Sequence, residues 1–174
     1  MKTNNGFTLV ELMVTIAIAA VLMAIAVPSF NNMLADNRLA TETNDVIGAI
    51  QFTRSEAIRR NRTITFCRAA SAAANTCTGG ANWTDWIVTN NPAAGTADTT
   101  LRRGTFAQSG GTMGIGSTLA ASRMAFRPDG LTDAVGGANT IRICTTSSTT
   151  NNVRQIEVGL SGRTTTATLT GGCP

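Results

Sequence analysis

The stretch Gly6-Phe7-Thr8-Leu9-Val10-Glu11-Leu12-Met13-Val14-Thr15 opens an apolar run that continues to Val27 and carries a single carboxylate, that of Glu11. The 21 residues from Phe7 to Val27 would form a helix that matches the hydrocarbon core of a bilayer, which is roughly 30 Å thick. The polar segment 1–6 precedes this run, and no Ala-x-Ala-like site follows it. Because a secretory signal is cut after its apolar region, we expect this helix to be retained as a membrane span.

Glu11 is the costly residue of this run, because a carboxylate beside hydrocarbon is unfavourable by a few kcal/mol unless it has a partner. One interpretation is that Glu11 only complements the helix dipole in the first turn. The other is that a cut after Gly6 gives Phe7 a new ammonium group, with which Glu11 of the same or a neighbouring subunit pairs. Such a pair would set the axial register of a polymer.

The charge and the cysteines predict the compartment of the remaining chain. Lys2 is the only lysine of the sequence, and a positive residue beside a membrane helix favours a cytoplasmic location for that end. The rest would then face the periplasm, where four cysteines form disulfides readily. Three pairings are possible; we favour Cys67–Cys77 and Cys144–Cys173 because each closes a shorter loop. Free thiols are the alternative, and a zinc site lacks both a histidine and a Cys-x-x-Cys motif.

Beyond the membrane run the sequence predicts a helix and then strands. Pro28 predicts a bend or a local break, after which a stripe at helical spacing runs to about Asn61 and would lie on a sheet. The stripe comprises Leu39, Thr43, Val46, Ile47, Ile50, Ala57 and Ile58, with Arg38, Glu42, Asp45, Arg59 and Arg60 mostly off it. Alternating segments then predict strands at 63–68, 86–89, 101–106, 123–127, 140–145, 154–160 and 163–169.

The N-terminal motif resembles a known processing site. Gly6-Phe7-Thr8-Leu9-Val10-Glu11 is similar to the prepilin peptidase recognition site of type IV pilins and type II secretion pseudopilins, in which the enzyme cuts after the glycine and methylates the new N-terminal phenylalanine. Residues 52–61, 82–88 and 125–130 resemble the helix end, tryptophan strand and glycine turn of the GspH/FimT branch of minor pilins, although Asp85 replaces the glycine expected before Trp86.

This resemblance implies an α+β fold of the type IV pilin kind, with a long N-terminal α-helix packed on a C-terminal antiparallel β-sheet head. We divide the chain into a leader (1–6), a transmembrane and polymerisation helix (7–29), an amphipathic extension (30–61) and a β-rich periplasmic head (62–174). The implied partners are other major and minor pilins, prepilin peptidase, the inner-membrane assembly platform and, before assembly, inner-membrane lipid.

A basic surface is the remaining feature of the head. Beyond residue 62, eight arginines stand against five carboxylates, and a guanidinium group binds phosphate through paired hydrogen bonds. The alternative explanation of this excess, which we favour over DNA binding, is a solvated face or salt bridges between subunits. Gly162-Arg163 resembles the start of the Gly-Arg-x-Arg element with which FimT-type minor pilins hold DNA, but Thr165 replaces the second arginine. If DNA binds, we expect a weak, non-specific contact with its phosphates, made by Arg163 together with Arg154 and Arg142.

The sequence does not favour catalysis. It has no histidine to act as a base and no phosphate-binding Gly-Lys-Ser/Thr loop, so we expect no enzyme activity, catalytic residue, metal, cofactor or small-molecule substrate. The resemblance instead implies a minor pilin in a tip or initiation complex of a type IV pilus. The alternatives are a GspH-like minor pseudopilin of a type II secretion system and a FimT-like pilin that binds DNA for natural transformation.

Overall fold

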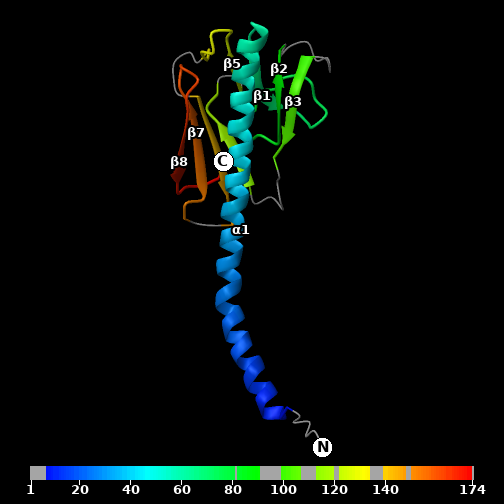
Figure 1. Ribbon diagram of the computed structural model, residues 1–174, viewed down its shortest axis with the longest axis vertical. Coiled ribbons are helices and arrows are strands. Elements are labelled where there is room, and N and C mark those ends of the chain that lie inside the picture. The colour runs from blue at the N-terminus through cyan, green and yellow to red at the C-terminus, as the bar shows by residue number, and fades with distance from the viewer. Residues whose placement is uncertain are drawn as a thin grey trace, which may run out of the picture.

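The computed structural model describes residues 7–80, 82–90, 99–106, 113–119, 122–133, 139–147 and 150–173. Gly6, the predicted cleavage position, lies outside them. One helix, α1 (Leu9–Arg60), forms a stalk in its first half and enters a β-rich head in its second half, as Figure 1 shows. α1 ends at Asn61, which adopts the left-handed conformation and donates its backbone N–H to the carbonyls of Ala57 and Ile58.

Pro28 does not interrupt α1, which is continuous from Leu9 to Arg60. Figure 1 shows a gentle curve in the stalk where the sequence allowed either a break or a bend. A proline removes one hydrogen bond and crowds the preceding turn, and a helix with good propensity on both sides can accommodate this by bending. The two predicted helical segments, 7–29 and 30–61, are therefore parts of one helix that runs from Leu9 to Arg60.

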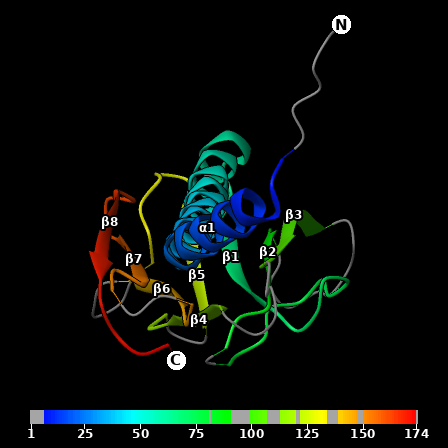
Figure 2. The same cartoon turned by 90° about the horizontal axis from the view of Figure 1, so that it is seen from below.

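The head contains two four-stranded antiparallel sheets rather than the single sheet that the sequence suggested. The first has the order β3-β2-β1-β5 and the second the order β4-β6-β7-β8. Figure 2 shows α1 lying across both sheets, with β1 to β3 on one side of it and β6 to β8 on the other. The strands are β1 (Ile64–Ala69), β2 (Asp85–Thr89), β3 (Thr100–Thr105), β4 (Met113–Ser117), β5 (Arg123–Phe126), β6 (Asn139–Thr145), β7 (Val153–Val158) and β8 (Thr164–Leu169).

The long helix on antiparallel sheets confirms the predicted α+β fold. Seven of the strands overlap predicted segments, whereas β4 (Met113–Ser117) was missed. Its sequence, Met-Gly-Ile-Gly-Ser, contains two glycines, and glycine is depleted in strands. Pairing with β6 nevertheless holds it in the sheet, with Ile115 opposite Ile143. Tertiary pairing thus decides this strand against its local propensity.

The helical stripe packs largely as expected, with two exceptions. Leu39, Val46 and Ile50 are fully buried against both sheets. Ile58, predicted to lie in the stripe, is instead half exposed; it lies in the last turn of α1, beside the turn that contains Gly130. Glu42, predicted to lie off the stripe, is buried.

Gly104 on β3 is required by the packing of Trp86. The two residues are opposite one another in the β2–β3 register, and a Cβ atom on Gly104 would lie 2.3 Å from the indole ring of Trp86. The indole ring cannot easily move away from residue 104, because Trp86 is buried and its ring centroid lies 5.6 Å from that of Phe66. The missing side chain at residue 104 therefore makes room for the indole.

Gly104→Ala is expected to lower the free energy of unfolding by about 1–3 kcal/mol, the usual cost of overpacking a core. Urea unfolding of the full chain in detergent measures this change. Gly48→Ala is the matched control, because nothing lies within 4 Å of the added Cβ on α1 and alanine favours a helix by about 0.5–1 kcal/mol. Equal stability of the Gly104 variant and the parent would contradict the proposed clash.

Candidate assembly interface

The start of α1 is closed by a reciprocal cap between Thr8 and Glu11. The Oε2 atom of Glu11 accepts hydrogen bonds from the backbone N–H of Thr8 at 2.9 Å and from its hydroxyl at 2.8 Å. In return, the Thr8 hydroxyl oxygen accepts the backbone N–H of Glu11 at 3.2 Å. This capping box satisfies donors that the start of a helix leaves unpaired. Glu11 therefore has a partner within the first turn of α1. Phe7, which directly precedes Thr8, is exposed.

The stalk presents an apolar surface that no other described residue covers. Residues 7–34 are exposed throughout, and the first part of α1 is long and apolar enough to cross a membrane. The first residue buried by the head is Ala35. A surface of this size is stable only when lipid or other helices cover it.

The three arginines predicted to bind DNA do not form one cluster. In the β6–β7 register, Arg142 is opposite Gln155, while Arg154 is opposite Ile143. Because neighbouring residues of a strand alternate between faces, Arg142 and Arg154 lie on opposite faces of the sheet. Arg163 lies in the turn before β8 and is exposed.

Arg154 faces α1 and is engaged there. One of its Nη atoms lies 3.8 Å from a carboxylate oxygen of Asp36, and the other donates a hydrogen bond to the backbone carbonyl of Asn151 at 2.7 Å. It lines a groove between α1 and the end of the second sheet, together with Ala40, Thr43, Asn44, Ile47, Thr166 and Thr168. The contact with Asp36 joins the lower part of the head to the stalk.

Glu56 binds the last two arginines of α1. It is buried, and its carboxylate accepts hydrogen bonds from Arg59 at 2.9 and 2.6 Å and from Arg60 at 2.6 Å. The hydrogen bonds from Arg59 and then Arg60 lower the pKa of Glu56 below its usual value. The charges of Arg59 and Arg60 are thereby partly neutralised by a carboxylate of the same helix turn.

Two glycine turns meet above Arg54 at the end of the head farthest from the N-terminus. Gly130 and Gly162 both have positive φ angles, of 76° and 73°, and a Cβ on Gly162 would lie 2.9 Å from the carbonyl oxygen of Gly130 and 3.0 Å from Nε of Arg54. This Nε atom is buried and has no hydrogen-bond partner among the described residues. The sequence indicated both turns, but no sequence signal brings them together, because they are separated by β6 and β7.

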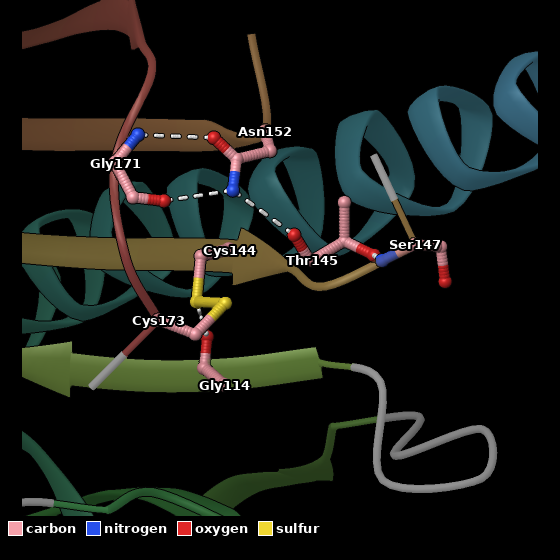
Figure 3. The surroundings of a disulfide bond; sticks show 7 residues. All are labelled: Gly114, Cys144, Thr145, Ser147, Asn152, Gly171 and Cys173. Carbon is pink, nitrogen blue, oxygen red and sulfur yellow. Dashed lines mark hydrogen bonds between the residues drawn. A yellow bond between two sulfur atoms is a disulfide. The ribbon is translucent and has the colours of Figure 1, made fainter. Parts of the chain in front are cut away.

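Two disulfides fasten the head. Cys67 of β1 is joined to Cys77 with a Cα–Cα distance of 5.6 Å, and Cys144 of β6 is joined to Cys173 with a distance of 5.5 Å. Figure 3 shows that the C-terminal segment crosses the sheet beside Asn152. The side chain of Asn152 donates to the carbonyls of Gly171 at 2.8 Å and Thr145 at 3.1 Å, and accepts the N–H of Gly171 at 3.1 Å. Cys173 and Asn152 therefore hold the same tail segment.

Comparison with known proteins places this arrangement in a family. The model of a family described as type II transport protein GspH matches residues 42–162, and that of the prokaryotic N-terminal methylation motif matches residues 1–27. Together these matches cover most of the stalk and head. The first of them alone spans more than half of the chain.

Two crystal structures of the type IV minor pilin FimU from Pseudomonas aeruginosa PAO1 have a similar fold. The P65 form is 17% identical with a TM-score of 0.54, covering 74% of this chain and 91% of FimU. The P21 form is 20% identical with a TM-score of 0.56, covering 80% of this chain and 94% of FimU. The TM-scores show a shared fold. The match of the GspH model over residues 42–162, together with the N-terminal methylation motif, establishes that this chain belongs to the GspH/FimT-like family of pilins and pseudopilins, whose members are structural and not enzymatic.

Proposed function

We propose that this chain is a minor subunit of a type IV pilus and acts by protein contacts in a tip or initiation complex. The observation that carries the role of fibre subunit is the bare apolar stalk, because residues 7–34 are exposed in the single chain. The similar fold of the type IV minor pilin FimU supports the choice of a pilus. Lipid of the inner membrane covers this surface in the precursor, and the helices of neighbouring subunits cover it in the fibre. The N-terminus is then cytoplasmic and the head periplasmic.

The processing steps of the proposal involve the residues at the start of α1. Prepilin peptidase cuts after Gly6 and methylates Phe7, and the assembly platform draws the mature subunit into the fibre. The Phe7 ammonium produced by the cut then competes with Thr8 for the Glu11 carboxylate. The capping box supports this last step, because its hydrogen bonds from Thr8 give Glu11 a partner before the ammonium exists.

A second candidate function is a minor pseudopilin of a type II secretion system. It is favoured by the description of the family that matches residues 42–162, type II transport protein GspH. The N-terminal requirements of the two functions are the same, since both fibres are built from helices with exposed apolar stalks. A DNA-binding function rests on Arg163 and is the third candidate.

Deletion of the gene is expected to remove surface pili and twitching, and expression of the intact chain is expected to restore both. Electron microscopy of sheared fibres and motility on agar measure these results. Loss of exoprotein release with pili intact would instead identify the pseudopilin. Loss of transformation alone, with pili and secretion intact, would identify DNA uptake as the function.

A further inference from the structure

The end of the head opposite the N-terminus carries an exposed apolar surface, which we call the apical patch and define by Ile58, Leu131 and Leu160. These side chains are 52%, 39% and 64% exposed. Beyond Leu34, the large exposed apolar side chains of the described residues are these three and Leu169. Soluble surfaces rarely gather such side chains without a partner, so their concentration at one end of the head indicates a contact site.

The three residues come from three separate segments that meet at this end. Ile58 is in the last turns of α1, and its Cδ1 atom lies 3.0 Å from the position of a Cβ on Gly130. Leu131 follows Gly130 directly, and the N–H of Thr132 donates to the carbonyl of Leu160 at 3.0 Å. Figure 1 shows the end of α1, the segment after β5 and the β7–β8 turn together at the top of the head. The three segments that carry the patch are therefore neighbours at this end of the head.

The patch is bordered by positive charge. Arg59 and Arg60 share Glu56, and Arg127 pairs with Asp129 at 3.0 Å. Arg54 lies beneath Gly130 and Gly162, and its buried Nε has no hydrogen-bond partner among the described residues. Arg163, next to Gly162, is exposed. The carboxylates on these segments are Glu56, Asp129 and the exposed Asp133. The five arginines named here outnumber these three carboxylates, so the complementary surface is apolar with carboxylates at its rim.

From the position and the charge of this surface, we propose that the apical patch binds the head of a different pilin subunit, whose contacting surface is apolar and bordered by carboxylates. The stalk leaves the opposite end of the head, so the apical patch faces away from the stalk. In a fibre whose stalks enter from the membrane, this direction is toward subunits that are already assembled. A second copy is a poor match, because this chain carries a net charge of +4 and Asp36, at its stalk end, is already beside Arg154. This inference rests on the proposed function as a fibre subunit.

The test uses the full processed chain in detergent micelles. The probes are the other processed pilin-like subunits of the same organism, each purified in the same detergent and titrated separately. One of them is expected to bind. Leu160→Asp is expected to weaken this binding by about tenfold or more, as at the centre of an interface. Arg163→Glu is expected to weaken it as well, and replacement of a rim carboxylate of the partner by lysine is expected to restore it.

Leu169→Asp is the matched control, because Leu169 is an exposed leucine at the other end of β8, paired with Val153 rather than near the turn. Its binding is expected to change by less than about twofold. Circular dichroism of each variant in the same detergent checks that the fold is retained. Leu160 is suited to this design because its 64% exposure makes a polar replacement compatible with folding.

Four outcomes would overturn the inference: none of the subunits binds, binding is equal for Leu160→Asp and the parent, Leu160→Asp disrupts only self-association, or it disrupts only binding of a short duplex DNA. Failure of the inference remains distinct from failure of the proposed function. A deletion strain without pili, combined with unchanged subunit binding by Leu160→Asp, would leave the pilus role in place and exclude the apical patch.

Discussion

Glu11→Ala is expected to remove the chain from assembled fibres while leaving it in the membrane. The substitution deletes the one carboxylate of the apolar run and, with it, the proposed partner of the Phe7 ammonium. A charge-assisted pair in a poorly solvated environment contributes about 2 kcal/mol or more. Its loss lowers the share of the chain in sheared fibres by about tenfold or more, which immunoblotting of the fibre and membrane fractions measures.

Glu11→Gln separates the two roles that the structure allows for this side chain. A glutamine retains an oxygen that accepts the N–H and hydroxyl of Thr8, so the cap at 2.9 and 2.8 Å can persist. It has no charge to pair with an ammonium. We therefore expect the glutamine variant to be lost from fibres as the alanine variant is. Incorporation of Glu11→Gln at the level of the parent would show that capping of α1, rather than a charge pair, is the function of Glu11.

Removal of the Cys144–Cys173 disulfide is expected to give the largest loss of stability among the substitutions considered. The bond joins positions separated by 29 residues, and the loop-entropy relation gives about 3.5 kcal/mol for such a loop. The pair Cys144→Ala and Cys173→Ala avoids placing a hydroxyl at residue 144, which is buried. Urea unfolding of the full chain in detergent, without reductant, measures the change in free energy.

The Cys67–Cys77 disulfide provides the comparison. Its residues are separated by only 10 positions, for which the same relation gives about 2.7 kcal/mol. The Cys67→Ala and Cys77→Ala pair is therefore expected to be destabilised by a smaller amount. A smaller loss for the Cys144 pair than for the Cys67 pair would contradict the loop-entropy argument. It would indicate that the hydrogen bonds of Asn152 to Gly171 and Thr145 hold the tail without the disulfide.

Local pattern was a good guide where one segment fixes its own structure. The apolar run predicted the stalk, the spacing of Leu39, Val46 and Ile50 predicted the packed face of α1, and alternation predicted seven strands. Local pattern was a poor guide where contacts with another segment determine whether a strand forms or a residue is buried. β4 forms against the preference of its glycines because β6 pairs with it. Ile58 is exposed and Glu42 buried because the extent of the sheets, rather than helical spacing, sets the edge of the core.

The candidate contact sites also differ in whether a single segment or the pairing of distant segments determines them. Thr8 and Glu11 are three residues apart, so their cap follows from the geometry of one helix turn, and the Thr-x-x-Glu spacing is a sequence signal for it that was missed. Arg142, Arg154 and Arg163 were grouped as basic residues near the C-terminus, yet strand alternation separates Arg142 from Arg154 by the thickness of a sheet. Only the register between β6 and β7 reveals that separation.

By itself, the sequence determined the stalk and the family, because the apolar run and the motifs that carry the resemblance are each contained in one short segment. The tertiary structure alone decided the arrangement of two sheets around α1 and the surface at the far end of the head. Ile58, Leu131 and Leu160 meet there because Gly130 and Gly162 let two turns approach above Arg54. Contacts between segments so far apart depend on strand pairing across the whole head, which no local pattern contains.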